Sequence, residues 1–324
     1  TFLTSTVKFF DIAVGSTGLG LSQARQAGFA ADAVVVHKMS HTSYYPGASR
    51  VTLQLVYDRE SGRILGAQSA GKVGIDKSID VVATALAAEM TLDELAQLDF
   101  AYAPPFNSPN GPVHIACFVG ENKRSGFSPS ILARDLEEML LGKEAIVLDL
   151  RDPISFAKAH FEGSQNVSIS MIRENLDRIS KEHMILLISD DGQKGHIALR
   201  LLKNEGFQNV FNLSGGYLSL ERQARVVPYA ELQVTLFPIT PKSAKKEEIS
   251  CESEQPIGEE CRQTKKAGAL IIDVRTPMEF EMGAIPDAIN IPLDLLPQKA
   301  EEVIGDRNRE VVVYCASGAR SAYA

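Results

Sequence analysis

The sequence predicts an α+β domain followed by two α/β domains with parallel sheets, the second of them truncated. Three observations carry this prediction. Residues 1–122 alternate strand and helix signals around one hairpin, and residues 127–224 alternate buried strands with helices, which is typical of a parallel sheet. Part of that second unit recurs at residues 266–324. A chain of 324 residues has room for two or three domains of ordinary size.

The first domain begins with signals for a strand, a helix, a strand and a hairpin. Gly62 lies in the connection of the hairpin, where a tight turn needs a left-handed backbone conformation. The following helix repeats apolar residues every three or four positions, and Thr91 with Glu94 forms a capping box for the next one. The expected strands are 7–14, 31–38, 50–59 and 64–72, and the expected helices are 21–28, 75–90 and 91–98.

The second unit has strands that read as continuous apolar runs, which indicates burial on both faces. The expected elements are a helix at 128–142, strands at 145–150, 184–190 and 210–213, a helix at 197–207 and a turn at 214–217. Residues 225–265 are rich in proline and charge, and we expect a linker that is partly disordered.

An internal repeat relates the second unit to the end of the chain. Residues 147–169 align with residues 271–293 without a gap. The aligned identities, all 124 positions apart, are Asp149 and Asp273, Arg151 and Arg275, Pro153 and Pro277, Phe156 and Phe280, and Asn166 and Asn290. We call residues 127–224 the first copy and residues 266–324 the second copy.

Composition excludes several classes of protein. A net charge of -8 argues against a protein that coats nucleic acid. No window approaches 18 uninterrupted apolar residues and the start lacks a basic leader, so we expect a soluble cytoplasmic protein that does not enter a membrane. The chain has too few cysteines, too widely spaced, for a disulfide framework: Cys117, Cys251, Cys261 and Cys315. We therefore expect a reactive thiol among them.

The strongest chemical signal is VVVYCASGARS, an apolar strand that runs into Cys315 and a short loop before a helix. Such a loop points backbone N–H groups at one spot, and the helix N-terminus and Arg320 add positive potential. A cysteine there should have a lowered pKa and act as a nucleophile. The loop residues are Ala316, Ser317, Gly318, Ala319 and Arg320.

The motifs DVRTPMEFEMGAIPDAINIP and YCASGAR resemble the rhodanese, or thiosulfate sulfurtransferase, family. The resemblance implies that Cys315 accepts a sulfane sulfur as a persulfide and passes it to a thiol, CoA being one candidate, or to cyanide. It also implies that Asp273 and Arg275 brace the loop rather than react. The four residues between Cys315 and Arg320 are the short spacing that goes with sulfur in the family. A phosphatase with a phosphate substrate and a buried strand-end thiol are the alternatives. The chain ends four residues after Arg320, where a rhodanese continues, so we expect the second copy to be incomplete.

The first copy departs from the motif. Ser189 replaces the cysteine, Lys194 replaces the arginine, and Gly192 remains in the loop between them. A serine forms no persulfide, and two adjacent aspartates oppose an anionic substrate. We therefore expect a spacer or docking module, with His160 and His196 in structural roles.

Cys251 and Cys261 lie in the charged linker with nine residues between them. We expect both to be solvated thiols. The alternatives are that they resolve the persulfide, or that they form a disulfide within the linker. No second pair of cysteines or histidines accompanies them, so we expect no metal site.

The motifs VKFFDIAVGSTGLG, SYYPGAS, SGRILGAQSAGK and AYAPPFNSPNGPV of the first domain resemble the dimerisation domain of pyridine nucleotide-disulfide oxidoreductases, most of all CoA-disulfide reductases and NADH oxidases. In that group a rhodanese often follows the reductase. The resemblance implies a homodimer, with FAD, NAD(P)H and CoA acting in the full-length enzyme, and it places Tyr44, Tyr45 and Tyr102 in motifs that contact CoA.

We expect no cofactor to be bound by this chain alone. Gly15, Gly18 and Gly20 are spaced GxxGxG rather than GxGxxG, and no acidic residue ends the next strand, so they are expected to turn the chain and cap a helix. The overall prediction is a rhodanese-type sulfurtransferase within a CoA-disulfide reductase-like fusion whose reductase core is not in this chain. The alternative is a non-catalytic dimerisation and docking fragment of that reductase.

Overall fold

The computed structural model describes most of the chain in two compact units, residues 1–243 and 244–324, which we treat separately. The described residues are 3–226, 235–236, 270–275, 280, 284–285, 288–293, 295–296, 299, 303–304 and 311–314. Among them, no helix has the length and apolar character needed to span a membrane.

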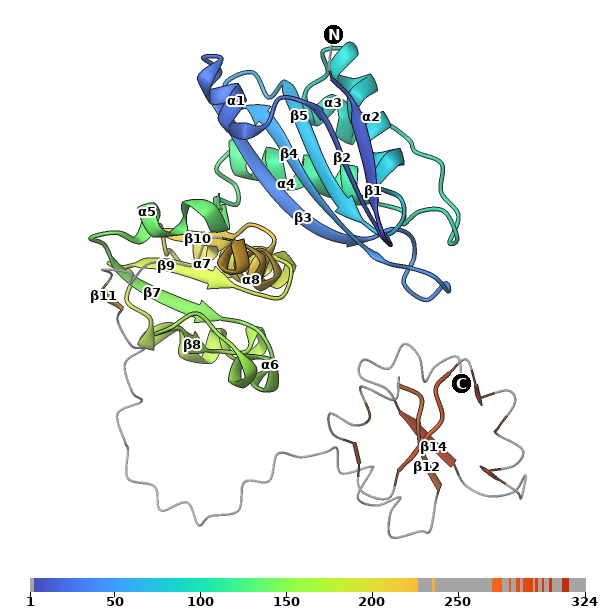
Figure 1. The fold of residues 1–324 in the computed structure, drawn as a ribbon. Helices are drawn as coiled ribbons and strands as arrows, with labels where there is room; N and C mark the ends of the chain where they lie inside the picture. The colour runs from blue at the N-terminus through green and yellow to red at the C-terminus, as the bar shows by residue number, and fades with distance from the viewer. Residues whose placement is uncertain are drawn as a thin grey trace. The chain divides into compact units, whose positions relative to one another are not determined.

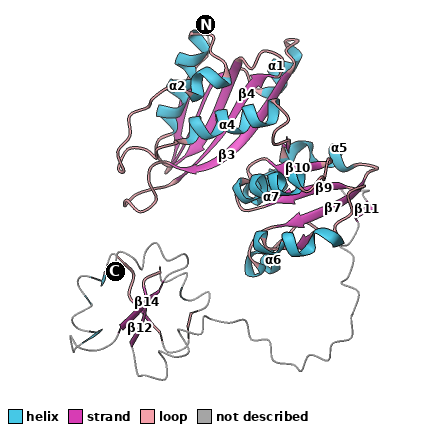
Figure 2. Cartoon of the chain, turned by 180° about the vertical axis from the view of Figure 1, so that it is seen from behind, coloured by secondary structure: helices cyan, strands magenta, loops and turns pink. Residues whose placement is uncertain are grey.

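The first domain is built on a five-stranded antiparallel sheet with the strand order β1-β2-β5-β4-β3 (Figure 1). Its strands are β1 (Ser5–Phe9), β2 (Ile12–Gly18), β3 (Ala31–Met39), β4 (Arg50–Asp58) and β5 (Ile64–Gly71), and its helices are α1 (Leu21–Gln26), α2 (Ile75–Ala87), α3 (Leu92–Ala96) and α4 (Pro112–Arg124). Helices α2 and α4 pack on one face of the sheet, and α4 crosses β3 and β4 in the view of Figure 2. The main core of the domain lies between that face and these helices.

Three local predictions for this domain are confirmed. The hairpin of β4 and β5 turns at Gly62, whose φ is 76°. The side chain of Thr91 accepts a hydrogen bond from the Glu94 N–H and caps α3. Gly20 is the N-cap of α1, as expected, whereas Gly15 and Gly18 were expected to turn the chain and instead lie in β2.

Other predictions for this domain were wrong. Residues 7–14 form two strands of a hairpin rather than one strand, because Phe10 takes a left-handed conformation with a φ of 53°. One long strand and two strands joined by a two-residue turn give the same alternation of side chains in the sequence. The alternation therefore could not show that the chain turns here. Helix α4 was missed, although Pro112 stands at its first position, where proline is favoured.

The first copy contains a parallel sheet, as predicted, with the strand order β11-β7-β9-β10-β6 and with β8 paired to β7. Its strands are β6 (Ser130–Ile131), β7 (Glu144–Asp149), β8 (Gln165–Asn166), β9 (Met184–Ile188), β10 (Val210–Leu213) and β11 (Thr235–Leu236). Its α-helices are α5 (Leu136–Leu140), α6 (Pro153–Lys158), α7 (Gln193–Asn204) and α8 (Gly216–Val226), with 3-10 turns at Ala133–Asp135, Ile169–Met171 and Arg173–Arg178.

The first copy differs from expectation at both ends. Residues 128–142 are not one helix, because Ser130–Ile131 pair with β10 and only Leu136–Leu140 are α-helical. Residues 214–217 were predicted as a turn; Ser214 and Gly215 form a turn, but Gly216 already opens α8. Strand β11 falls in the segment predicted as a linker and pairs with β7.

The second copy has a three-stranded parallel sheet in its described part. Its strands are β12 (Leu270–Asp273), β13 (Ile289–Asn290) and β14 (Val311–Tyr314), in the order β13-β12-β14. The side chains of β12 are buried and contribute to a small apolar core. Strands β12, β13 and β14 correspond to β7, β8 and β9, so the repeat in the sequence is a repeat in the fold.

Candidate active site

An ion pair between Asp149 and Arg151 closes the end of β7 in the first copy. The Arg151 Nη2 lies 2.7 Å from the Asp149 Oδ2, and Nε lies 3.0 and 3.1 Å from the two carboxylate oxygens. Both side chains are buried, at 5% and 0% exposure. The amide of Asn166 donates to the backbone carbonyls of both residues, at 3.0 and 2.8 Å. We call this arrangement the brace.

The second copy has the same brace. The Arg275 Nη2 lies 2.6 Å from the Asp273 Oδ2, with Nε at 3.0 and 2.9 Å from the carboxylate oxygens. The Asn290 amide donates to the carbonyls of Asp273 and Arg275, at 3.0 and 2.9 Å. Three of the residues identical at an offset of 124 therefore make the same hydrogen bonds in both copies.

The electrostatics of the second brace stabilise the ionised carboxylate. Burial raises the pKa of the Asp273 carboxyl, but hydrogen bonds from Arg275 and Tyr314 and the charge of Arg275 outweigh it and hold that pKa below its usual value. Burial and the hydrogen bond to Asp273 raise the pKa of the Tyr314 phenol, whose oxygen also accepts a hydrogen bond from the Ile285 N–H at 3.0 Å. Tyr314 thus ties the brace to the segment around Ile285.

The register of the strands gives the two loops the same starting point. Asp149 pairs with Ile188 in the first copy, and Asp273 pairs with Tyr314 in the second. The residues that follow these partners in the sequence are Ser189 and Cys315. Cys315, the loop residues Ala316 to Arg320, and the linker cysteines Cys251 and Cys261 lie outside the described residues.

Ser189 is buried in the first copy, and its hydroxyl fills the centre of the loop. The Ser189 Oγ accepts hydrogen bonds from the N–H groups of Gly192, at 3.2 Å, and Gly195, at 3.1 Å. Gly192 has a φ of 94°, which a residue with a Cβ rarely adopts, and this conformation begins α7. The amides that a rhodanese loop would offer to an anion are here hydrogen-bonded to a neutral hydroxyl.

The charged residues of this loop are paired. The Lys194 ammonium lies 3.5 Å from the Asp190 carboxylate. One oxygen of Asp191 accepts a hydrogen bond from the Gln193 N–H at 3.1 Å, and the other lies 3.8 Å from the Lys38 ammonium of the first domain. Lys194 therefore does not stand as a free cation over the loop.

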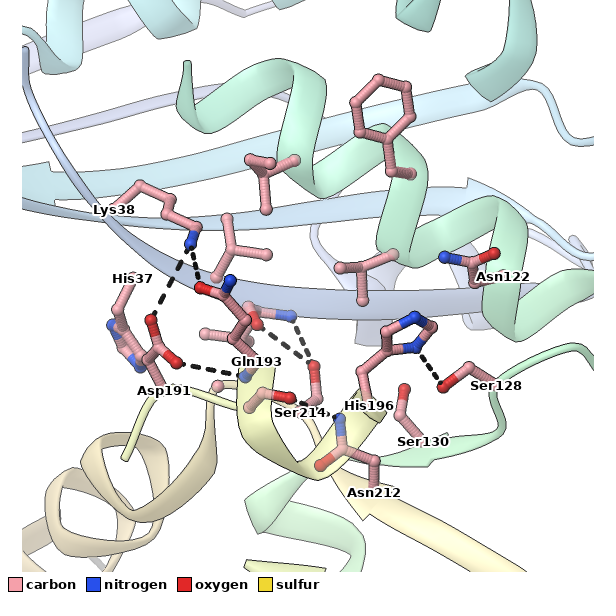
Figure 3. Close-up of a pocket in the computed structure, with 17 residues that line it drawn as sticks. His37, Lys38, Asn122, Ser128, Ser130, Asp191, Gln193, His196, Asn212 and Ser214 are labelled. Atoms are coloured by element: carbon pink, nitrogen blue, oxygen red, sulfur yellow. Dashed lines mark hydrogen bonds and ion pairs between the residues drawn. The ribbon is translucent and has the colours of Figure 1, made fainter. Parts of the chain in front are cut away.

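A cavity of about 270 Å³ lies where this loop faces β3 and α4 of the first domain (Figure 3). Its apolar wall comes from the first domain, and its polar wall comes from the loop and from β10. The Lys38 ammonium crosses the boundary and donates to the Gln193 side-chain oxygen at 3.3 Å. The lining includes Val35, Val36, His37, Lys38, Ile115, Phe118, Val119, Asn122, Ser128, Ser130, Asp191, Gly192, Gln193, His196, Asn212, Ser214 and Gly215.

Both histidines for which we expected structural roles make local contacts. The His196 Nδ1 lies 2.9 Å from the Ser128 Oγ, and burial and the charge of Arg200 lower the pKa of His196. The His160 Nδ1 lies 2.9 Å from the carbonyl oxygen of Phe156, in the same helix region. Within the part of the chain that the structure describes, no histidine or carboxylate is hydrogen-bonded to the Ser189 hydroxyl.

Contacts between the first copy and the edge strand β3 were missed by the sequence analysis. The Val35 N–H donates to the Ser214 Oγ at 2.9 Å, and that hydroxyl donates to the Val35 carbonyl at 3.2 Å. One serine thus satisfies both outward backbone groups of an edge-strand residue. These two residues are 179 positions apart, so no local pattern could have revealed the contact.

The tyrosines expected in CoA contacts lie at the surface of the first domain. Tyr44, Tyr45 and Tyr102 are 75%, 43% and 49% exposed. The Tyr45 ring meets the His41 ring edge to face, with 6.0 Å between centroids. Among the described residues, no group of three histidine, cysteine or acidic side chains is arranged to hold a metal ion.

Two known families match the sequence. Residues 4–110 match the family described as pyridine nucleotide-disulphide oxidoreductase, dimerisation domain. Residues 132–223 and 258–324 match the rhodanese-like domain. Among curated proteins, the coenzyme A disulfide reductase of Staphylococcus haemolyticus is 37% identical over 112 residues, which are 35% of this chain and 25% of that protein. Its counterpart from Staphylococcus aureus strain Newman is 38% identical over 109 residues, or 34% and 24%.

Two solved structures resemble the chain over most of its length. The reduced CoADR-RHD of Bacillus anthracis is 30% identical with a TM-score of 0.65, covering 69% of this chain and 40% of its own. The NAD-dependent persulfide reductase of A. fulgidus is 33% identical with a TM-score of 0.59, covering 66% and 38%. The chain therefore spans about a quarter of the curated relatives and about two fifths of these two structures.

Proposed function

We propose that this chain, which joins a pyridine nucleotide-disulphide oxidoreductase dimerisation domain to rhodanese-like domains in the order of a CoA-disulfide reductase and rhodanese fusion, transfers sulfane sulfur through Cys315. The observation that carries the proposal is that Cys315 directly follows Tyr314, whose phenol is hydrogen-bonded to Asp273 of the second brace. Asn290 of β13 is hydrogen-bonded to the Asp273 end of β12, and Asp273 pairs with Tyr314, the last residue of β14. The residue after Tyr314 in the sequence is Cys315, the cysteine of the YCASGAR motif.

The reaction has two steps. The Cys315 thiolate attacks the outer sulfur of a sulfane donor such as thiosulfate; a new S–S bond forms, the S–S bond of the donor breaks, and sulfite leaves with the bonding electron pair. An acceptor thiolate then attacks the outer sulfur of the persulfide, and the Cys315 thiolate leaves. In this proposal the loop amides and Arg320 balance the negative charge in both steps.

The first copy has a docking role in this proposal. Ser189 supplies no thiol and is already hydrogen-bonded to two loop amides. Asp191 and Gln193 of the loop engage Lys38, and Ser214 engages Val35 of the sheet edge. The boundaries we propose are a dimerisation domain at 1–122, the two copies at 127–224 and 266–324, and a linker at 225–265.

The cofactors belong to the complete enzyme in this proposal. FAD and NAD(P)H would supply electrons there, and CoA would be the thiol partner near Tyr44, Tyr45 and Tyr102. The glycines that could suggest a dinucleotide site do not fit one, because Gly15 and Gly18 lie in a strand that pairs with β1 and β5 instead of in a loop between a strand and a helix. No step here uses these cofactors. Homodimer formation through the first domain is part of the same proposal.

Intact mass spectrometry after incubation with thiosulfate tests the proposal. We expect an addition of about 32 Da, labile to cyanide and thiols, in the unaltered chain and in a Cys251→Ser, Cys261→Ser double variant. Cys315→Ser should show no addition and keep its fold. No addition to the unaltered chain would favour the alternative, a dimerisation and docking fragment without sulfurtransferase activity.

A gain-of-thiol variant tests the proposed role of the first copy. Ser189→Cys restores the nucleophilic atom but keeps Asp190 and Asp191 in the loop. We expect one added sulfur per chain, as in the unaltered protein. In this proposal, features of the first loop other than Ser189 also prevent sulfur transfer. A second sulfur on this variant would contradict that.

A further inference from the structure

A second groove of about 360 Å³ lies between the first domain and α8 of the first copy. No residue of the loop between Ser189 and Gly195 lines it. Its floor is the sheet face opposite α2 and α4, and no aspartate or glutamate is among the described residues that line it. The residues that line it include His37, Thr52, Gln54, Gln68, Ser219 and Arg222.

The floor of the groove is a strip of polar side chains set by the register of the sheet. Thr52 and Gln54 of β4 line the groove, and Arg50, an alternate residue of the same strand, points to the same face beyond the lining. Gln54 pairs with Gln68 of β5, and the Gln54 amide donates to the Gln68 side-chain oxygen at 3.2 Å. The buried residues between them, such as Leu53, point to the opposite face. This strip carries a cation and hydrogen-bonding groups.

Arg222 of α8 covers the strip. Its guanidinium contacts the Thr52 hydroxyl and the His37 Nδ1, the latter at 3.3 Å. Burial and the nearby charge of Arg50 lower the pKa of Arg222 more than the charge of Glu221 raises it. Glu221 forms its ion pair with Arg225. Neither arginine has a carboxylate within ion-pair distance among the residues that the structure describes. The charge of Arg50 thus disfavours the charged form of Arg222, and an anion that contacts both guanidinium groups would offset this repulsion.

The hydrogen bonds also indicate which ring nitrogen of His37 carries the proton. A guanidinium only donates, so the His37 Nδ1 facing Arg222 is an acceptor, and the proton of the neutral ring is on Nε2, which donates to the Ser219 Oγ at 2.9 Å. His37 adds no positive charge while it is neutral. The anion-binding charge of the groove is thus that of the arginines.

We propose that this groove binds an oxyanion of the phosphate class, held by Arg222 and Arg50 and by the amide groups of Gln54 and Gln68. Guanidinium groups match the oxygens of phosphate in geometry and charge, and side-chain amides donate further hydrogen bonds. Both arginines are exposed enough for an anion to reach them from solvent. The bound anion would join α8 to β4 and so strengthen the contact between the first copy and the sheet.

Isothermal titration calorimetry of the 324-residue chain with inorganic phosphate, at constant ionic strength against chloride, tests this site. We expect Arg222→Gln to weaken phosphate binding about tenfold or more, as the loss of one charge-assisted hydrogen bond predicts. The matched control is Arg225→Gln, because Arg225 lies on the same helix and is paired with Glu221 at 2.7 Å. This variant should bind phosphate like the unaltered chain.

If the Arg222 variant misfolds, Arg50→Gln supplies a second test. Within the described part of the chain, the Arg50 side chain makes no ion pair or hydrogen bond that this substitution would break. It should also weaken phosphate binding about tenfold. Absence of phosphate binding in the unaltered chain would overturn the proposal. So would equal binding by the unaltered chain and the Arg50 variant, or an equal loss in the Arg225 variant.

Discussion

The two copies share a scaffold and differ in the loop that the scaffold holds. Both join an aspartate, an arginine and an asparagine in one network at the end of a parallel strand. In the first copy that network stands beside a buried serine, and in the second it stands beside the strand that leads into Cys315. The brace therefore accompanies the fold whether or not a nucleophile follows it.

The aromatic cover of the arginine also differs between the copies. The Arg151 guanidinium lies 3.5 Å from the ring centroid of Tyr217, which comes from α8. The Arg275 guanidinium lies 5.6 Å from that of Tyr314, which directly precedes Cys315. In the second copy the brace thus touches the residue next to the proposed nucleophile, whereas in the first copy Ile188 stands there. Substitutions in the brace and in the loops can show whether the shared scaffold and the different loops contribute to stability independently.

Removal of the arginine of the brace should have the largest effect. Arg151→Met leaves the buried Asp149 carboxylate without its counter-charge, and we expect a loss of about 3–5 kcal/mol in the free energy of unfolding. Arg275→Met should cost less, because the Arg275 side chain is 16% exposed and that of Arg151 is 5% exposed. Hydrogen exchange followed by mass spectrometry on peptides of β7 and β12 measures each loss. Equal losses in the two copies would contradict this ranking.

The contact of the first copy with the sheet should depend on pH through His37. Burial, with the charges of Arg222 and Arg50, lowers the pKa of His37 from 6.5 to about 4. The unfolded chain therefore takes up a proton near pH 6.5 and the folded chain only near pH 4. The contribution of His37 to the free energy of unfolding is therefore at its maximum above pH 6.5, and the free energy falls by about 3 kcal/mol as the pH drops to 4.

Urea unfolding between pH 4 and pH 7 measures this dependence. His37→Gln should flatten the profile in that range. The exposed His160 supplies the matched control, because His160→Gln should leave the slope as it is. An unchanged slope in the His37 variant would show that other groups cause the pH dependence.

Loss of the serine hydroxyl should have an intermediate effect. Ser189→Ala leaves the buried N–H groups of Gly192 and Gly195 without their acceptor, and we expect a cost of about 1–3 kcal/mol. Ser189→Cys keeps an acceptor, though a weaker one, and should cost less. Urea unfolding of both variants measures the difference. A neutral Ser189→Ala variant would mean that the hydroxyl is not what organises the first loop.

The ion pair between the loop and the first domain should matter least. Asp191→Asn removes the charge that faces Lys38 but keeps an oxygen for the Gln193 N–H. Both side chains of the pair are partly exposed, at 27% and 31%, and we expect a cost of less than about 1 kcal/mol that decreases in high salt. A larger, salt-independent cost would show that this contact is a main determinant of docking.

Local patterns in the sequence were enough to find the repeat and the residues that form the brace, whereas the bracing role expected of Asp273 and Arg275 came from the resemblance to the rhodanese family. Asp149, Arg151 and Asn166 recur at one offset, and identical residues at identical spacing on the same strands make the same hydrogen bonds. The capping box at Thr91 and the turn at Gly62 were predictable for the same reason, since each depends on residues within a few positions. The turn at Phe10 was not, because a bulky residue with a positive φ has no local sequence signal.

The sequence by itself determined the order of the domains, the parallel sheets of the two copies, and which loop carries a cysteine. Only the tertiary structure decided what the cysteine-free loop contacts and where cations gather without counter-charges. Ser214 meets Val35, and Arg222 meets Thr52, across 179 and 170 positions. Contacts over such distances depend on how two folded surfaces meet, and neither hydrophobic periodicity nor a local motif records that geometry.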